Sequence, residues 1–398
     1  MNDRGKSNEY VPASPVDPRW NILACCAMST KKRVAAIVTV YRPNAHADVI
    51  VSRLIGELGH YPQVKLVSLY TDQVPDNDLS RELAARHGFA ICDTIEQAVS
   101  FGNPEQPIDG IVVIGEHGEY PWNEKRQHLY PRLRFMQETL AALDKFGLRV
   151  PIFLDKHFSC DDGAARWIYD EVKRRGIALM AGSSIPYAPS VPAYDPAVLR
   201  GVRDLFVVSH GGHESYGFHA MEVMQSLAER RTGAETGVAS VTALEGEAVW
   251  EAMERGEWPE ALMLQALAAL PEVPDGHPRG LCADPALFVV AYKDGTRGYV
   301  AQLDGVATRW SYAVRAADGT ATAAYCDTDT ERPYRHFETL VCLIEEMVTK
   351  GKPPCATERQ LLTTHMINAA MESLYAKRPI AVPELGVAYV PADEQPLH

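Results

Sequence analysis

An alternation of short apolar runs and amphipathic segments in the first half of the chain constrains the fold more than any other feature. Continuous apolar runs of the kind that form buried parallel strands occupy residues 34–40, 64–70, 110–115 and 150–154. The segments between them predict helices at about 46–58 and 79–87, and a long one in which Leu129, Leu133, Met136, Leu140 and Leu143 recur at steps of four and three residues. This alternation favours a doubly wound parallel sheet, whose functional groups gather at the carboxyl ends of the strands.

The pattern changes after Gly182, and from about residue 200 the apolar strands are longer and separated by sharp turns. Asp-Gly pairs at 294–295, 304–305 and 318–319 predict hairpins in an antiparallel sheet. Helices are expected at 218–230 and 246–269 before these strands, and at 335–350 and 357–376 after them. The second half of the chain is therefore expected to combine helices with a large sheet.

Composition narrows the class of protein. The formal net charge of −13 argues against nucleic-acid binding, which requires clustered Lys and Arg. The eight cysteines show no Cys-x-x-Cys pair, which indicates reduced thiols in a cytoplasm, and no apolar run approaches the roughly 18 residues that would suggest a membrane span. We expect a cytoplasmic protein with a small-molecule substrate, and we interpret residues 1–27 as an extension before the working start.

The densest cluster of reactive side chains lies in the middle of the chain. A strand-like run from Leu205 leads into a glycine turn and a helix that together carry His210, His213, Glu214, His219 and Glu222. Two further polar groups follow predicted strands, Glu116-His117-Gly118-Glu119 and Asp155-Lys156-His157. Imidazoles, carboxylates and an amine brought together in this way could transfer protons or bind a metal.

The order of elements, Asp155-Lys156-His157 at a strand end and Gly217-Phe218-His219 at a helix start resemble the glucose-fructose oxidoreductase and inositol dehydrogenase (Gfo/Idh/MocA) family. The resemblance, which also covers Asn368-Ala-Ala-Met-Glu-Ser373, implies an N-terminal Rossmann-like parallel sheet and a C-terminal α+β domain with a large, mainly antiparallel open sheet. It implies an extension at 1–32, a Rossmann-like domain at 33–185, the α+β sheet domain at 186–334, and C-terminal helices and a tail at 335–398 that pack back on both. Homodimers or homotetramers through the open sheet are also implied.

The resemblance places the family's catalytic Lys on Lys156 and its His on His219, with Ser215 where the family has an Asp. The cofactor turn departs from the family, because no glycine occurs between Gly5 and Gly56. A β-carbon at a position of close approach should push a pyrophosphate away from the helix N-terminus. This departure makes NAD(P) the less favoured cofactor, although Arg42 could still hold an anion there.

The leading hypothesis from the sequence is therefore a metal-assisted enzyme without hydride transfer, a lyase, hydratase or hydrolase that acts on a polyhydroxylated or carbonyl-bearing small molecule. A divalent metal, Zn, Mn or Fe, would be held by some of Glu116, His117, His157, His213 and His219. Proton transfer is expected from Lys156, His157 and His219, with Glu222 orienting His219, and Tyr120, Trp122 and Tyr187 are candidates for stacking on the substrate.

Two alternatives remain open at this point. One is an NAD(P)-dependent sugar or polyol oxidoreductase in which Lys156 and His219 move the proton. The other is a non-catalytic sugar-binding or assembly protein. Each candidate residue also has a structural interpretation: Lys156 could pair with Asp155 or Glu116, the histidines could stabilise turns, and the aromatic residues could only pack.

Overall fold

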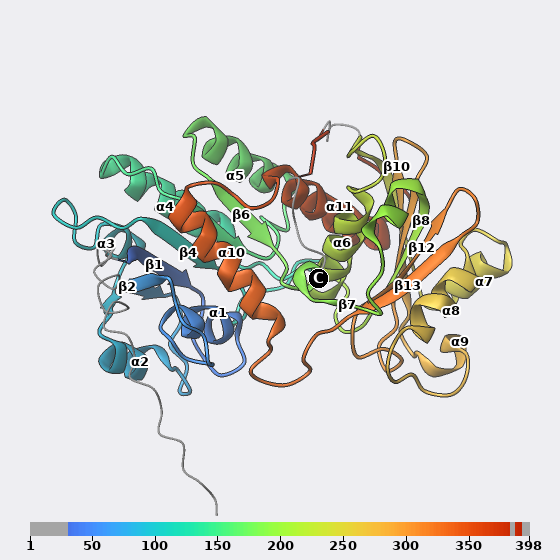
Figure 1. Ribbon diagram of the computed structural model, residues 1–398, viewed down its shortest axis with the longest axis horizontal. Helices are drawn as coiled ribbons and strands as arrows, with labels where there is room; N and C mark the ends of the chain where they lie inside the picture. The colour runs from blue at the N-terminus through green and yellow to red at the C-terminus, as the bar shows by residue number, and fades with distance from the viewer. Residues whose placement is uncertain (1–30, 383–386, 392–398) are drawn as a thin grey trace, which may run out of the picture. The chain divides into compact units, whose positions relative to one another are not determined.

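The first half of the chain forms a six-stranded parallel sheet (Figure 1). The computed structural model describes residues 31–382 and 387–391. The sheet has the order β3-β2-β1-β4-β5-β6, with strands β1 (Lys32–Val38), β2 (Val64–Thr71), β3 (Ala90–Cys92), β4 (Gly110–Ile114), β5 (Ile152–Asp155) and β6 (Leu179–Gly182). This is the Rossmann-like, doubly wound arrangement expected from the alternating apolar runs, which are buried because helices cover both faces.

The helices of this half divide between the two faces of the sheet. One face packs on α1 (His46–Leu54), α2 (Ser80–His87) and α10 (His336–Lys350). The other face packs on α3 (Ile95–Val99), α4 (Arg132–Lys145) and α5 (Asp162–Arg174). Successive residues of β1, such as Ala36 and Ile37, belong to the two different cores, because neighbouring side chains of a strand point to opposite faces.

The second sheet has eight strands in the order β14-β9-β10-β11-β8-β12-β13-β7. Its strands are β7 (Ser190–Val191), β8 (Val202–Ser209), β9 (Val238–Glu245), β10 (Ala286–Tyr292), β11 (Arg297–Gln302), β12 (Ser311–Ala316), β13 (Ala321–Cys326) and β14 (Ile380–Ala381). Neighbouring strands are antiparallel except β8 and β11, which are parallel. The expected mixed α/β fold with a large, mainly antiparallel sheet is thus confirmed.

Two of the three predicted hairpins are present, and the third is wrong. The turns at Asp294 and Asp318 join β10 to β11 and β12 to β13. The turn at Asp304 does not join neighbours, because β8 lies between β11 and β12. Its carboxylate instead accepts a hydrogen bond from the backbone N–H of Gly211 at 3.2 Å, which ties the turn to the end of β8.

Helices cover both faces of the second sheet as well. The inner face packs on α6 (Ser215–Ala228) and α11 (Thr357–Ala376), and the outer face packs on α7 (Glu247–Glu254) and α8 (Glu260–Ala268), with α9 (Pro278–Leu281) beside them (Figure 1). The single helix expected at 246–269 is therefore two helices, and Pro259 is the N-cap of the second. Assembly through the open sheet stays a prediction, and α7 and α8 already occupy its outer face.

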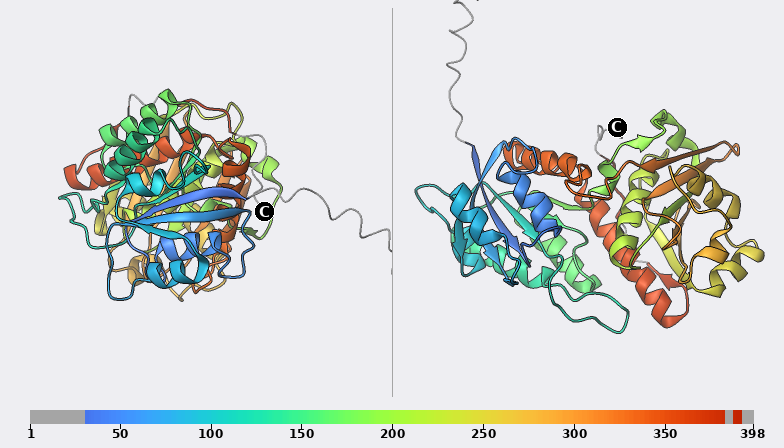
Figure 2. Two further views of the ribbon diagram at one scale, coloured as in Figure 1. Left: turned by 90° about the vertical axis from the view of Figure 1, so that its left-hand side faces the viewer. Right: turned by 90° about the horizontal axis from the view of Figure 1, so that it is seen from below.

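Helix α11 links the two sheets. It packs against α5 and β6 on one side and against α6 and β9 on the other, and Figure 2 shows it between the two sheets. The described residues from Lys32 onward form one compact unit. Within the described part of the chain, no helix is both long and apolar enough to cross a membrane.

Candidate functional site

A cavity of about 1200 Å³ opens at the carboxyl ends of β4, β5 and β8. Its walls come from both halves of the chain: Glu116 and Lys156 follow strands of the parallel sheet, whereas His210 and Trp310 belong to the second. The carboxyl edge of a parallel sheet is where α/β proteins bind their ligands, so the topology places the cavity at the expected edge.

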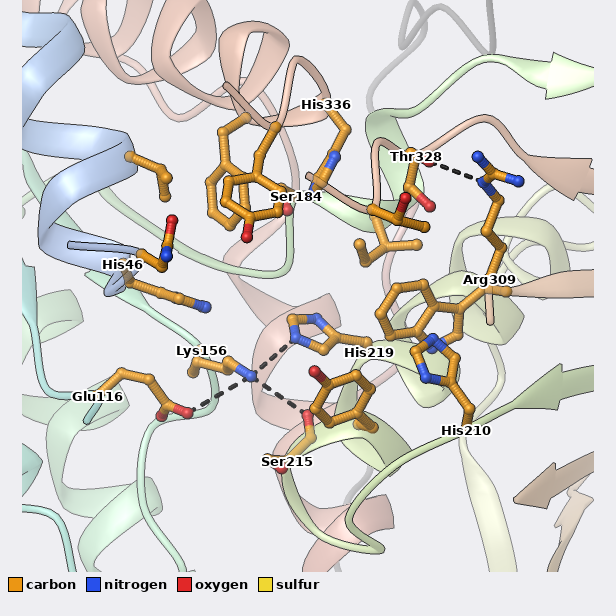
Figure 3. A pocket seen from close by; sticks show the side chains of 18 of the residues that line it. His46, Glu116, Lys156, Ser184, His210, Ser215, His219, Arg309, Thr328 and His336 are labelled. Carbon is orange, nitrogen blue, oxygen red and sulfur yellow. Dashed lines mark hydrogen bonds and ion pairs between the residues drawn. The ribbon is translucent and has the colours of Figure 1, made fainter. Parts of the chain in front are cut away.

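Lys156 and His219 meet at the base of this cavity (Figure 3). Lys156 Nζ lies 2.8 Å from Nε2 of His219 and also donates to the backbone oxygen of Ser215 at 3.3 Å. The backbone of Lys156 has a positive φ of 68°, and its N–H bonds the carbonyl of Gly182, the last residue of β6, at 3.1 Å. The left-handed turn that ends β5 thus directs the amine toward α6.

Burial and nearby charges shift the pKa values of Glu116 and His219. The Glu116 carboxylate lies 3.6 Å from Lys156 Nζ and 2.6 Å from the guanidinium of Arg132. Burial opposes ionisation, but these two cations hold the pKa of Glu116 well below its ordinary value. Burial, with a further contribution from the Lys156 charge, lowers the pKa of His219 well below its ordinary value, so the imidazole is neutral at pH 7.

The expected metal site is absent. Among residues 31–382 and 387–391, no group of three or more His, Cys, Asp or Glu side chains could hold a metal ion. Glu116, His117, His157 and His219 line the cavity, but His213 lies outside it, 3.9 Å from Asp284.

Cations stand where a metal would have to bind. Arg132 Nη1 lies 3.2 Å from Nε2 of His157, and Lys156 faces Nε2 of His219. Arg132 and Lys156 also share the Glu116 carboxylate, so the acid and imidazole groups already face positive charges. The prediction of a divalent metal is therefore wrong.

The other predicted site residues separate into those at the cavity and those behind it. Trp122 lies at the cavity, 61% exposed, and stacks on His128 with ring centroids 4.0 Å apart. Tyr120 instead donates to Asp72 at 2.7 Å, and Tyr187 is buried where it accepts a hydrogen bond from Arg359 at 2.8 Å.

Glu222 is also behind the cavity, where it accepts a hydrogen bond from the Thr363 hydroxyl. It does not touch His219 in any contact that the structure records among the described residues, and burial raises its pKa. Glu222 therefore does not orient His219 directly. It lies beside Gly182 at the end of β6, and the next residue, Ser183, contacts the His219 ring.

Sequence reasoning missed three groups at the site. His46, the first residue of α1, lines the cavity and bonds Asp155 through Nδ1 at 2.6 Å. Arg132, the first residue of α4, is buried against Glu116. Tyr216 and Trp310 stack with centroids 5.6 Å apart beside His219. Of these, only His46 could have been predicted from the sequence, because the residue that begins the helix after β1 must lie at the carboxyl edge of the sheet.

The segment between β4 and α4 crosses from one half of the molecule to the other and forms a wall of the cavity. Arg126 pairs with Glu245 at 2.6 Å, and Gln127 bonds Asn368 at 3.1 Å. The backbone N–H of His128 donates to Glu214 at 2.8 Å. These contacts fix the stacked rings of this segment at the cavity mouth.

The turn between β1 and α1, residues 39–45, is where a dinucleotide would meet this type of sheet. It is covered by the segment after β4: a β-carbon on Gly118 would lie 3.3 Å from Val40 and 3.0 Å from the side chain of Gln73. A second hollow of about 500 Å³ lies beyond this contact and is lined by Arg42, Gln73 and Val74.

Two charged side chains near this turn, Arg42 and Asp72, differ in whether other side chains already bind them. The guanidinium of Arg42 makes no hydrogen bond or ion pair with any residue in the described ranges. Asp72, the acid after β2, is fully engaged: burial would raise its pKa, but hydrogen bonds from two tyrosine hydroxyls and Arg134 lower it. The carboxylate of Asp72 is thus not free to bind a ligand, whereas the guanidinium of Arg42 is.

Solved structures of sugar and polyol dehydrogenases share this fold, so the expected resemblance to the Gfo/Idh/MocA family is confirmed at the level of fold. GenD2 from gentamicin A biosynthesis, solved in complex with NAD, has a TM-score of 0.59 at 14% sequence identity over 94% of this chain and 99% of its own. The scyllo-inositol dehydrogenase from Lactobacillus casei has a TM-score of 0.58 at 12% identity over 89% and 99%.

The UDP-N-acetylglucosamine 3-dehydrogenase GnnA from Acidithiobacillus ferrooxidans has a TM-score of 0.54 at 12% identity over 87% of this chain and 98% of its own. No sequence-family profile matches the chain. No curated protein sequence matches it either.

These likenesses and the geometry correct the leading functional hypothesis. The three similar structures named above are dehydrogenases, one of them with NAD bound, and the described residues offer no metal site. The hypothesis of a metal-dependent lyase, hydratase or hydrolase is therefore wrong, as is the preference for a metal over NAD(P).

Proposed function

We propose that the protein is an NAD(P)-dependent oxidoreductase that acts on a hydroxyl or carbonyl group of a sugar or polyol. The observation that carries the proposal is the Lys156–His219 pair, 2.8 Å apart, at the base of a cavity large enough for a substrate beside a nicotinamide ring. The fold of known dehydrogenases supports it.

The pair suits proton transfer to and from a substrate oxygen. A hydroxyl placed against it could donate its proton to the neutral Nε2 of His219 while its oxygen accepts a hydrogen bond from Lys156. The ammonium would then stabilise the negative charge that develops on that oxygen. Glu116 and Arg132 hold Lys156 in place from the other side.

A bound nicotinamide dinucleotide would supply the hydride acceptor or donor. His46, Lys156 and His219 would surround its nicotinamide end, and the second hollow with Arg42 and Gln73 would take its adenosine end. In this arrangement the guanidinium of Arg42 takes over the contact with phosphate that glycine backbone makes in the common fingerprint.

The aromatic walls of the cavity fit a polyhydroxylated substrate. The Trp122 ring stacks on His128 and is mostly exposed, and the Tyr216–Trp310 stack lies next to His219. Such rings pack on the apolar C–H face of a sugar while its hydroxyls reach polar side chains.

Fluorescence titration of the purified protein with NADH and NADPH tests the proposal directly. We expect saturable binding in the micromolar range, with turnover of a panel of cyclitols, aldoses and nucleotide sugars followed at 340 nm. No binding of either dinucleotide up to millimolar concentration would contradict the proposal and favour a sugar-binding protein without catalytic activity.

A further inference from the structure

The ring of His219 is held through both of its nitrogens. Nε2 faces Lys156 at 2.8 Å, and Nδ1 lies 2.6 Å from the hydroxyl oxygen of Ser183, the residue that follows β6. Ser183 is 2% exposed and does not line the cavity, so it contacts the ring from behind. Ser183 thus holds the ring of His219 from a position outside the cavity.

We infer that Ser183 is a positioning residue that holds the ring of His219 by its Nδ1, with the ring proton on Nδ1 and the Nε2 lone pair toward Lys156. The inference deepens the proposed oxidoreductase function and rests on it only for its kinetic consequence.

The tautomer follows from the donors around the ring. An ammonium group has only donors, so Nε2 of His219 accepts from Lys156 and the ring proton resides on Nδ1. Nδ1–H then donates to Oγ of Ser183, which also accepts the backbone N–H of Ile185 at 3.0 Å. The opposite tautomer would direct an N–H at the ammonium. Because the Ser183 hydroxyl can either accept or donate, Lys156 selects the tautomer and Ser183 fixes the direction of the ring.

The position of Ser183 is itself set by the buried end of β6. The buried Glu222 carboxylate lies beside this end of β6, and the Thr363 hydroxyl donates to it. The preceding carbonyl, that of Gly182, accepts the backbone N–H of Lys156 at 3.1 Å. Gly182 therefore holds the backbone of Lys156, and the next residue, Ser183, holds the ring of His219.

Glycine is required at the first of these two residues. A β-carbon on Gly182 would lie 2.4 Å from Oε2 of Glu222, and the φ of Gly182 is +113°. Without a β-carbon, the backbone at the end of β6 can pack directly against the Glu222 carboxylate.

A serine bonded to a histidine also suggests a nucleophile, but the surroundings of Ser183 exclude that role. Its hydroxyl is buried behind the ring and does not line the cavity, so no substrate could reach it. Ser184, the next residue, does line the cavity and is not bonded to His219.

The tautomer can be measured without any assumption about the reaction. The full-length protein labelled with ¹⁵N-histidine is compared with a His219→Gln variant, which assigns the His219 resonances. We expect the wild type at pH 7 to show a protonated Nδ1 and an unprotonated Nε2 for His219. A proton on Nε2 in the wild type would overturn the inference, whatever any variant does.

Substitutions then test whether Ser183 holds the ring. Ser183→Ala should shift or broaden the His219 ¹⁵N resonances, because the ring loses its Nδ1 partner, and Ser183→Thr, which keeps the hydroxyl, should restore the wild-type spectrum. Ser190→Ala is the matched control, because it removes an equally short buried hydrogen bond, 2.6 Å to Tyr312, away from the site. A His219 spectrum that is unchanged in Ser183→Ala would contradict the inference.

Kinetics provide the second measurement once a substrate is known. Ser183→Ala should lower kcat roughly 10- to 100-fold with little change in KM, as loss of a group that orients a functional histidine does, and Ser183→Thr should recover most of it. Failure of the protein to bind NADH or NADPH would end the proposed function but leave the tautomer result standing. The expected tautomer with an unaltered kcat in Ser183→Ala would refute the positioning role alone.

Discussion

Lys156 Nζ lies 2.8 Å from Nε2 of His219, although the two residues stand 63 positions apart and belong to different halves of the fold. Lys156 ends a strand of the parallel sheet, and His219 lies in the first turns of the helix that follows the central strand of the second sheet. The pair therefore exists only when both halves are folded and docked.

Replacement of either member of this pair should remove activity. We expect Lys156→Met and His219→Gln each to lower kcat/KM by roughly 10² to 10⁴, because the substrate oxygen loses its proton donor or acceptor. Lys173→Met, on the surface of α5, is the control. Steady-state kinetics with circular dichroism separate loss of activity from loss of fold, and wild-type rates in both site variants would rule out the proposed roles.

Arg42 should determine how tightly the dinucleotide binds. Removing its guanidinium in Arg42→Ala should raise the Kd roughly tenfold, about 1.4 kcal/mol, because a phosphate would lose a charge-assisted hydrogen bond. Isothermal titration with NADH and NADPH measures the effect. Arg166→Ala, on the outside of α5, should leave both values unchanged. Equal affinities in the Arg42 variant and the wild type would show that phosphate binds elsewhere.

Substitution of Gly182 should destabilise the protein more than substitution of another glycine with a positive φ. Gly182→Ala combines a left-handed φ of +113° with a β-carbon 2.4 Å from Glu222, so it should lower the free energy of unfolding by about 3 kcal/mol. Gly176→Ala has a φ of +64° but meets no atom within 4 Å, and about 1 kcal/mol is expected. Urea unfolding compares the two, and equal losses would contradict the role assigned to the close contact.

Replacement of Trp258 should affect stability, whereas replacement of Trp122 should affect substrate binding. Trp258 is buried between α8 and the second sheet and donates to the backbone of Val249 at 2.9 Å, so Trp258→Ala should lower stability by about 3 to 5 kcal/mol. Trp122 is mostly exposed, so Trp122→Ala should leave stability unchanged and raise KM. Thermal unfolding and steady-state kinetics measure both. A stable Trp258→Ala protein would mean that α7 and α8 do not contribute to the fold.

Stability should fall in mild acid because histidines are buried in neutral form. Burial lowers the pKa of His336 from 6.5 to about 4. Between these values the unfolded chain binds a proton that the folded chain does not, so the free energy of unfolding falls as the pH drops from 6.5 toward 4. One such histidine contributes a slope of about 1.4 kcal/mol per pH unit.

Urea unfolding at pH 7, 6 and 5 measures this slope. His336→Gln should make the pH dependence shallower, whereas replacement of the exposed His277 serves as the surface control. An identical slope in His336→Gln and the wild type would show that the acid sensitivity arises from other groups.

Much of the fold could be predicted from local pattern. The alternating apolar runs predicted the parallel sheet, since a strand buried on both faces needs apolar residues at every position. Two Asp-Gly turns predicted correct hairpins, but the Asp304–Gly305 turn did not, because β8 pairs with both β11 and β12 and separates them. Turn chemistry reports a reversal of the chain and not which strand fills the space beside it.

The candidate site could be predicted only in part. Lys156 and His219 were placed at the carboxyl edges of strands, and the structure brings them together. The metal prediction failed because composition shows how many imidazoles and carboxylates approach a site but not which cations accompany them. Arg132 is the example, because its guanidinium is buried against Glu116 and lies 3.2 Å from Nε2 of His157.

The sequence by itself determined where the strands run, where they end, and therefore which side chains stand at the edge of each sheet. Only the tertiary structure decided which of those side chains face one another. Burial, hydrogen-bond geometry and charge pairing depend on atoms that are distant along the chain: Ser183 reaches His219 from 36 residues away, and Arg132 reaches His157 from 25. Protonation follows from those contacts, so it is a property of the folded site and not of the residue types alone.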